Sequence, residues 1–323
     1  MIGFDIGGTK CAVCIGEEIN GELVIKDKKI IPTDHSISPY EMIDRMCKLT
    51  DELTDDVDVI GISCGGPLNS KKGKIMSPPN LPGWDDVKIV DYLKEKYNVN
   101  VYLENDANAC AVAEWKYGAG KGVNNMVFMT FGTGLGAGLI LDGKLYRGAN
   151  DMAGEAGHIR LSSFGPVGYG KAGSFEGFCS GGGIAQLGKT YAQEKLQMGK
   201  TVSFCENVSE LDTITAKSIA EYAYKGETDA IEIYETCGAM LGRGLSILID
   251  ILNLDRIVLG SIFQRSEDLI RPKMQEILEK ECLAYSLDAC EVVPAKLGDN
   301  IGDYAALAVG IMNEERIDKE GKE

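Results

Sequence analysis

The chain is poor in histidine and in basic side chains. Among its 323 residues there are 2 His, and 33 Lys and Arg stand against 49 Asp and Glu, which gives a formal net charge of −16. So few histidines argue against a His-rich metal centre. An acidic chain also lacks the positive charge that binds nucleic-acid phosphates. We therefore expect no nucleic-acid partner.

Long apolar runs and an export signal are missing too. No apolar stretch approaches the ~18 residues of a membrane span, and the N-terminus has no basic region followed by an apolar one. The 10 cysteines have no regular spacing, which favours buried thiols of a reducing compartment over a disulfide framework. These absences predict a cytoplasmic protein without a membrane partner.

Glycine, in contrast, is abundant and clustered, with 40 residues. The hydrophobic content of 44 % with 25 % charged residues is typical of a globular protein. Strand and helix patterns predict an N-terminal α/β domain over 1–115, completed by a helix at 303–317, and a C-terminal α/β domain over 116–302. Both halves open with a strand, a Gly-Thr turn and a second strand, so we expect two coupled domains with a cleft between them.

The two Gly-Thr turns are candidates for binding phosphate. Glycines allow close backbone approach and direct N–H groups at phosphate oxygens, while Thr and Lys add a donor and a charge. An acidic residue at a strand end suits Mg²⁺. An ordinary glycine-rich hairpin remains the alternative for each turn taken alone. The candidates are Asp5, Gly7, Gly8, Thr9 and Lys10 in the first turn, and Thr133 and Gly134 in the second.

An Asn-Asp pair follows a predicted strand and opens a predicted helix over 106–117. Asp106 lies where an N-cap residue belongs, so a plain helix cap is the simplest interpretation. Asn105 beside it favours a second interpretation, because such a pair at the carboxyl end of a strand is well placed to bind hydroxyl groups. Asp106 could then accept a substrate hydroxyl proton during phosphoryl transfer.

A second cluster combines a carboxylate and an imidazole among glycines. Glu155 and His158 are three residues apart in Gly-Glu-Ala-Gly-His, a setting that favours hydroxyl binding over a core position. Glu176 follows in a glycine-rich loop that we expect to be flexible enough to close over a ligand. The other histidine, His35, has no such context and is interpreted as a surface residue.

Together these motifs resemble the ROK family of bacterial sugar kinases and sugar-responsive repressors. The resemblance covers nearly the whole chain and rests on five segments in order. They are Asp5-Ile6-Gly7-Gly8-Thr9-Lys10, Gly65-Gly66-Pro67, Glu104-Asn105-Asp106-Ala107-Asn108-Ala109, Gly132-Thr133-Gly134-Leu135-Gly136 and Gly154-Glu155-Ala156-Gly157-His158.

The resemblance implies an α/β, two-domain actin/hexokinase-like (ribonuclease H-like) fold that binds ATP and Mg²⁺ at the interdomain cleft. It implies Asp106 as the catalytic base and Gly260 near the nucleoside, with the Gly-Thr turns on the phosphates and Mg²⁺ near Asp5. It also implies a homodimer or homotetramer. The residues that would bind the sugar are Gly66, Asn80, Asn105, Glu155, His158 and Glu176.

One departure from the family pattern concerns zinc. The family follows its histidine with three cysteines that bind structural zinc together with that histidine. Here Val167, Tyr169 and Ser174 stand at the three cysteine positions. We therefore expect no zinc site and a segment held by packing instead.

The resulting functional hypothesis is ATP-dependent phosphorylation of a hexose at its 6-hydroxyl. The substrate would be glucose, a related hexose or an N-acetylhexosamine. One alternative is a non-catalytic sugar-binding sensor or regulator, because the family includes repressors. Another is a kinase of a different small polyol or acid.

Overall fold

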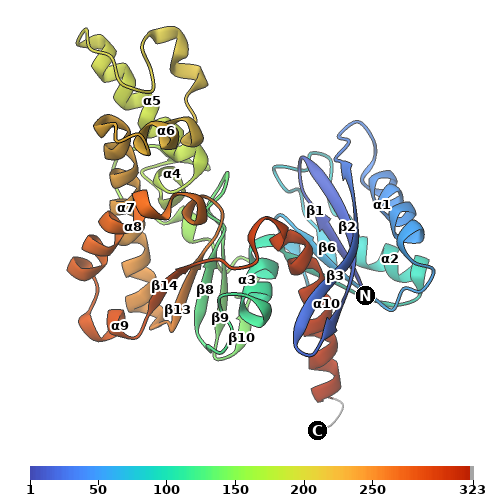
Figure 1. Cartoon of the computed structure of the whole chain (residues 1–323). Coiled ribbons are helices and arrows are strands. Elements are labelled where there is room, and N and C mark those ends of the chain that lie inside the picture. The colour runs from blue at the N-terminus through green and yellow to red at the C-terminus, as the bar shows by residue number, and fades with distance from the viewer. Residues whose placement is uncertain (321–323) are drawn as a thin grey trace. The chain divides into compact units, whose positions relative to one another are not determined.

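The computed structural model describes residues 1–320 and has an α/β architecture (Figure 1). By contacts the chain divides into two compact units. Unit 1 comprises 1–124, 138–154 and 296–323, and unit 2 comprises 125–137 and 155–295. The domain bounds expected from the sequence, 1–115 and 116–302, stay a prediction.

Unit 1 is built on a mixed five-stranded sheet with strand order β3-β2-β1-β4-β7. Strand β2 pairs antiparallel with β1 and β3, while β1, β4 and β7 run parallel. The carboxyl ends of these parallel strands lie at one edge, where α/β proteins usually bind ligands. The strands are β1 (Ile2–Ile6), β2 (Lys10–Ile19), β3 (Glu22–Pro32), β4 (Val59–Cys64) and β7 (Asn100–Asn105).

Helices cover both faces of this sheet. Ile2, Phe4 and Ile6 alternate along β1 and share a core with apolar side chains of α1 (Pro39–Leu53) and α2 (Ile89–Tyr97). On the opposite face lie α3 (Asp106–Tyr117) and α10 (Ile301–Glu320). A Cβ at Gly61 would lie 2.0 Å from the Ala306 carbonyl oxygen, so glycine is what lets α10 approach β4.

Two hairpins complete unit 1. Strands β5 (Leu68–Asn69) and β6 (Lys74–Ile75) form one, and β9 (Ala137–Leu141) with β10 (Lys144–Tyr146) forms the other. Gly138 of β9 packs on α3, because a Cβ there would lie 2.6 Å from the Ala111 methyl carbon.

Unit 2 combines three parallel strands with a helical layer. Strand β13 pairs with both β8 and β14. Gly238 and Gly242 let α7 and α8 pack closely, since a Cβ at either would lie within 2.7 Å of an α8 carbonyl oxygen. The elements are β8 (Met126–Met129), β11 (Val167–Gly168), β12 (Lys171–Ala172), α4 (Phe175–Phe178), α5 (Gly181–Gln197), α6 (Ala216–Ala223), α7 (Thr228–Leu252), β13 (Arg256–Leu259), α8 (Ile262–Glu281), α9 (Ala284–Asp288) and β14 (Glu291–Pro294); short 3₁₀ turns are η1 (Ala156–His158), η2 (Val208–Thr213) and, in unit 1, η3 (Gly298–Asn300).

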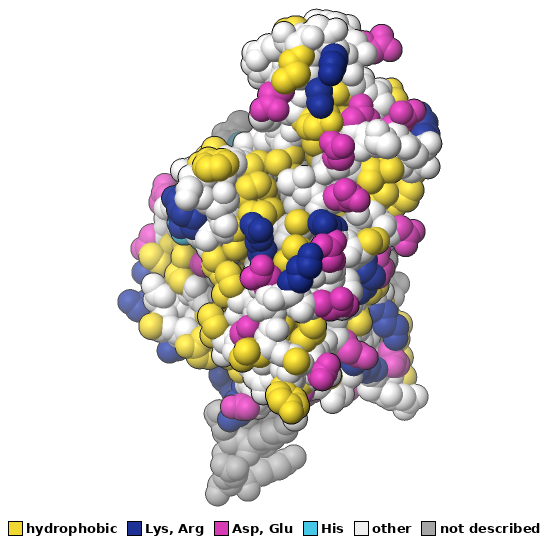
Figure 2. Space-filling view, turned by 90° about the vertical axis from the view of Figure 1, so that its left-hand side faces the viewer, with side chains coloured by type: hydrophobic (Ala, Val, Ile, Leu, Met, Phe, Trp, Pro, Cys, Tyr) yellow, Lys and Arg dark blue, Asp and Glu magenta, His cyan; other side chains and the backbone are white. Residues whose placement is uncertain are grey.

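The burial of the cysteines and the charges on the outer surface agree with what the composition predicted. All ten cysteines are free thiols and only Cys282 is partly exposed, as expected for buried thiols. On the face drawn in Figure 2, basic side chains lie among acidic ones and form no continuous basic surface. Within residues 1–320, no helix combines the length and the apolar character needed to cross a bilayer.

Glu114 of α3 has a fully buried carboxylate that binds the segment with which the chain re-enters unit 1 at Lys296. Its Oε1 accepts the N–H groups of Lys296 and Leu297 at 2.9 and 2.8 Å, and its Oε2 accepts the N–H of Ala119 at 2.7 Å. These bonds hold the segment that leads into α10, and so hold α10 on the sheet.

Replacing Glu114 by Ala should lower the free energy of unfolding by about 3 kcal/mol, because three backbone N–H groups lose a charged acceptor. Urea unfolding followed by circular dichroism measures this loss. The matched control is E22A, which removes a surface carboxylate paired with Lys121; an equal shift of the unfolding midpoint in both variants would contradict this role for Glu114.

Candidate functional site

The first glycine turn of unit 1 is closed by its own backbone, with the Gly7 N–H donating to the Lys10 carbonyl at 3.1 Å. A Cβ at Gly8 would lie 2.4 Å from the Asn80 carbonyl oxygen. The absence of a side chain at Gly8 therefore lets Asn80 lie against this turn. Thr9 and Lys10 are exposed and free to meet a ligand.

Asn105, not Asp106, is the N-cap of α3, which corrects the sequence-based placement. Asn105 has extended backbone angles, because β7 continues through it, and its Oδ1 accepts the N–H groups of Ala107 and Asn108 at 3.0 and 3.3 Å. Its amide nitrogen Nδ2 faces Gly66, where a Cβ would lie 3.2 Å away. The structure thus brings Gly66 and Asn105 together.

Asp106 is the first residue of α3, with its carboxylate partly held and partly accessible. Its Oδ1 accepts the Ala107 N–H at 2.8 Å, and a Cβ at Gly65 would lie 3.8 Å from Oδ2. Surrounding protein raises the pKa of the Asp106 carboxyl, while hydrogen bonds from the backbone and Asn105 oppose the rise. The side chain still keeps an exposed surface, so a substrate can reach this strengthened base.

Asp5 at the end of β1 belongs to a group of carboxylates. Burial, and then the charges of Asp303 and Asp106, raise the pKa of Asp5 to about 6, against the attraction of Lys28 and Lys10. Asp303 of α10 is buried and its Oδ2 pairs with Lys28 Nζ at 2.5 Å, while its Oδ1 has no hydrogen-bond partner. The magnesium position expected near Asp5 stays a prediction.

Two further residues contribute to the site at the ends of β1 and β7, and the sequence analysis did not predict them as site residues. They are Glu104 and Asp303. The Glu104 carboxylate is fully buried and accepts from Arg147 Nε at 2.7 Å, from Asn108 Nδ2 at 3.0 Å and from the Asn105 N–H at 3.1 Å. Glu104 could have been predicted as a site residue from its place inside the Glu-Asn-Asp motif. Asp303 could not, because it lies almost 300 residues from Asp5 along the chain.

The second glycine turn, in unit 2, is tied to Glu176. The Leu135 N–H donates to Glu176 Oε2 at 3.0 Å, and a Cβ at Gly134 would lie 2.8 Å from the same oxygen. Helix α5 begins beside this turn, with the Gly181 N–H donating to the Gly132 carbonyl at 2.8 Å. The structure therefore joins Glu176 to the turn that carries Thr133 and Gly134.

Gly260 lies at the end of β13, next to the same turn. Its N–H donates to the Met129 carbonyl at 2.9 Å. The following residue, Ser261, lies near Gly132, where a Cβ would be 3.7 Å from Ser261 Oγ. Gly260 and the second glycine turn are thus neighbours within unit 2.

Glu155 directly precedes the 3₁₀ turn η1 and His158 is its last residue, and both side chains are exposed. A Cβ at Gly157 between them would lie 2.2 Å from the Leu135 carbonyl oxygen, so η1 packs directly on the second glycine turn. The His158 ring meets the Tyr169 ring edge-on at 6.2 Å between centroids.

The segment around Glu176 is not the loose loop expected from its glycines. Residues 175–178 form α4, capped by the buried Ser174 side chain, which accepts the Gly177 N–H at 3.0 Å. Val167 pairs with Ala172 between β11 and β12. At two of the positions where the family pattern has cysteines, this chain thus has backbone pairing and a helix cap. Across residues 1–320, no group of three or more His, Cys, Asp or Glu side chains is arranged to hold a metal ion.

His35 has a context that the sequence did not reveal. Its Nε2 lies 2.8 Å from the Gly8 carbonyl oxygen, and the neighbouring Thr33 hydroxyl donates to the Gly7 carbonyl at 2.6 Å. Residues 33–35 therefore support the first glycine turn.

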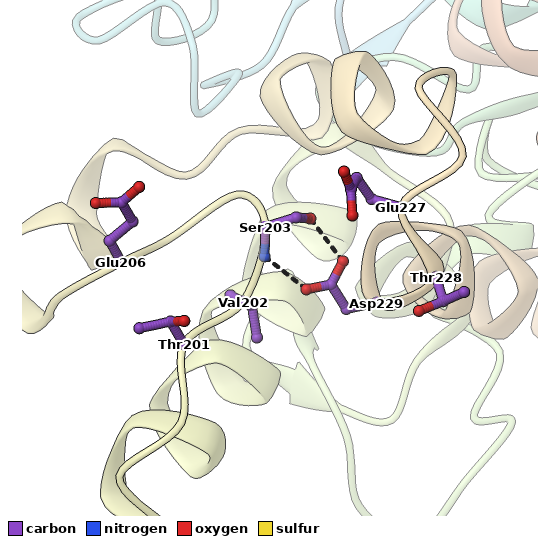
Figure 3. A pocket seen from close by; sticks show the side chains of 7 residues that line it. All are labelled: Thr201, Val202, Ser203, Glu206, Glu227, Thr228 and Asp229. Atoms are coloured by element: carbon purple, nitrogen blue, oxygen red, sulfur yellow. Dashed lines mark hydrogen bonds between the residues drawn. The ribbon is translucent and has the colours of Figure 1, made fainter.

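A separate pocket of unit 2 contains none of the candidate residues. It lies between 201–206 and the start of α7, where the Ser203 N–H and hydroxyl both donate to Asp229 (Figure 3). Glu206 and Glu227 also line it, and its acidic wall does not suit a phosphate group.

Stability should depend on the protonation of Asp5. Because its folded pKa of about 6 lies above the ordinary value of 3.8, the folded chain keeps a proton that the unfolded chain loses as the pH rises through this interval. Asp5 therefore destabilises the fold progressively above pH ~4, by up to about 3 kcal/mol above pH ~6. D5N should be more stable than the wild type at pH 8 and lose that advantage at pH 4, measured by urea unfolding. A pH-independent difference, or the same gain in the exposed-carboxylate control D55N, would contradict this.

Known proteins are similar to this chain over nearly its whole length, including all the candidate site residues. The family model "ROK family" matches residues 1–310. A glucokinase of Halalkalibacterium halodurans is 31% identical, with 93% of this chain and 92% of that protein covered. A crystal structure of a ROK family glucokinase from Streptomyces griseus in complex with glucose and AMPPNP is 27% identical, with a TM-score of 0.76 over 97% of this chain and 99% of that one. A xylose repressor of Caldicellulosiruptor bescii is 27% identical over 84% of this chain and 67% of its own length.

The solved structures agree with the α/β architecture. The fold is that of the actin-like sugar kinases, as the sequence predicted. The chain belongs to the ROK family.

Proposed function

We propose that the chain is an ATP-dependent sugar kinase that phosphorylates a hexose, glucose or a related hexose or N-acetylhexosamine, at the 6-hydroxyl. The observation that carries the proposal is the Asp106 carboxylate, which is exposed at the start of α3 beside the Asn105 amide, with a raised pKa. The glucokinase relatives support the reaction class.

In this proposal Asp106 accepts the proton of the sugar hydroxyl as that oxygen attacks phosphorus. Its raised pKa makes it a stronger base than an ordinary Asp carboxylate. The Ala107 N–H bond to Oδ1 restrains the carboxylate, leaving Oδ2 for the substrate. Positioning supplies much of the rate in phosphoryl transfer, so the rigid cap at Asn105 is part of the mechanism.

Hydroxyl recognition is assigned to side chains with unused hydrogen-bonding atoms. Asn105 uses Oδ1 for the cap and one Nδ2 hydrogen for Asp106, which leaves its second Nδ2 hydrogen, and Glu176 uses Oε2 for Leu135 and offers Oε1. The exposed His158 adds a ring that can donate or accept. The remaining members of the proposed sugar set are Gly66, Asn80 and Glu155.

The nucleotide is assigned to the two glycine turns. Residues of the first turn (Gly7, Gly8, Thr9 and Lys10) and of the second (Thr133 and Gly134) would bind phosphate oxygens, with Asp5 facing Mg²⁺ and Gly260 near the nucleoside. ATP supplies the phosphoryl group, and Mg²⁺ neutralises its charge. The close approach of Asn80 to Gly8 and of Glu176 to Gly134 explains why both turns need glycine.

Asp106→Asn should lower kcat by a factor of about 10²–10⁴ or more, because the amide cannot take the proton. An ADP-release assay with glucose, mannose, fructose, allose and N-acetylhexosamines measures turnover and also identifies the preferred sugar. The exposed Asp55→Asn variant is the control. Near-normal turnover of D106N with its best sugar would refute Asp106 as the base.

A second candidate is a sugar-binding regulator without turnover, which the xylose-repressor relatives favour. It predicts that a sugar raises the melting temperature of the wild type while no ADP forms with any sugar of the panel. The kinase proposal predicts both effects for the same sugar.

A further inference from the structure

Unit 1 has a pocket whose walls are rich in cations, although the chain carries a net charge of −16. This basic pocket has a volume of about 320 Å³. Its walls come from the β5–β6 turn, α2, β7 and α10, and Asp91 is the one carboxylate among its lining residues. The basic residues that line it are Lys71, Lys72, Lys94, Arg147 and Arg316.

The turn that carries two of these lysines is anchored at both ends. The Ser70 N–H and hydroxyl donate to the two Asp151 carboxylate oxygens at 3.0 and 2.8 Å. Gly73 has a φ of +63°, and a Cβ there would lie 2.4 Å from Val90 Cβ. The turn is therefore seated on α2, and Lys71 and Lys72 project from a fixed support.

Three of the five basic residues of the pocket are lysines without an ion-pair partner among the described residues. Lys74 and Lys96, nearby in the sequence, pair with Asp86 and Asp44. In the described part of the chain, Lys71, Lys72 and Lys94 form no such ion pair. Arg147 gives only its Nε to Glu104, so its two terminal nitrogens can donate to a ligand. The three lysines and the terminal nitrogens of Arg147 are thus the groups that bring available positive charge to the pocket.

We propose that the basic pocket binds a small molecule that carries a phosphoryl group. A phosphate dianion suits a pocket lined by several cations better than a single carboxylate does, since it spreads charge over three acceptor oxygens. Lys supplies compact charges and Arg a planar fork for such oxygens. A volume of about 320 Å³ lies at the small end of ligand pockets. None of the residues assigned to the sugar or to ATP lines it.

The test is calorimetric titration of inorganic phosphate, glycerol 3-phosphate and citrate into the full chain. The two phosphate probes separate a free phosphate ligand from a phosphate ester, and citrate tests for a polycarboxylate. K71A/K94A should lose this site or bind at least tenfold more weakly, because two charged contacts are removed. K200A/K217A, with the same charge change on exposed lysines of unit 2, should bind like the wild type.

A second measurement needs no variant: lysine acylation mapped by mass spectrometry should show Lys71 and Lys94 protected by the phosphate probe and Lys200 not protected. The proposal is overturned if the wild type binds neither phosphate probe, if both double variants are affected equally, or if citrate binds as tightly as glycerol 3-phosphate. The readout is binding, so it does not depend on whether the chain is a sugar kinase.

Discussion

The buried carboxylate of Glu104 is the contact on which much of unit 1 depends. It is fully inaccessible, yet it is paired with Arg147 and bonded to the Asn105 N–H and the Asn108 amide. Such a charge is tolerated in a protein interior only when its partners are complete. It fixes the end of β7, where Asn105 and Asp106 stand, and it also holds Arg147 at the wall of the basic pocket.

Unlike Glu104, the carboxylates of Asp5 and Asp303 are not fully matched by positive charge and hydrogen-bond donors. Their carboxylates concentrate negative charge near the end of β1, with Lys28 as a partial counterion. Burial, and then the charges of Asp303 and Asp106, raise the pKa of Asp5 to about 6, so folding alone gains nothing from this arrangement. A bound cation would relieve this repulsion.

Local sequence patterns predicted the α/β class and some of the helix and strand positions. The helix predicted over 106–117 is confirmed as α3 with the same bounds. The cap at Asn105 was missed because strand and helix meet without an intervening residue. The α4 turn was missed because glycines at 173 and 177 suggested a loop, whereas they permit close packing on Ser162 and Pro166. Asp303 and the basic pocket depend on distant parts of the chain, which no local pattern reports.

We propose that this chain transfers a phosphoryl group from ATP to the 6-hydroxyl of a hexose. Phosphorus NMR of the wild type with ATP, Mg²⁺ and the best-binding sugar tests this directly. A new phosphomonoester resonance of a hexose 6-phosphate should grow in step with ADP. Sugar binding without such a resonance, or ADP accompanied only by inorganic phosphate, would contradict this proposal.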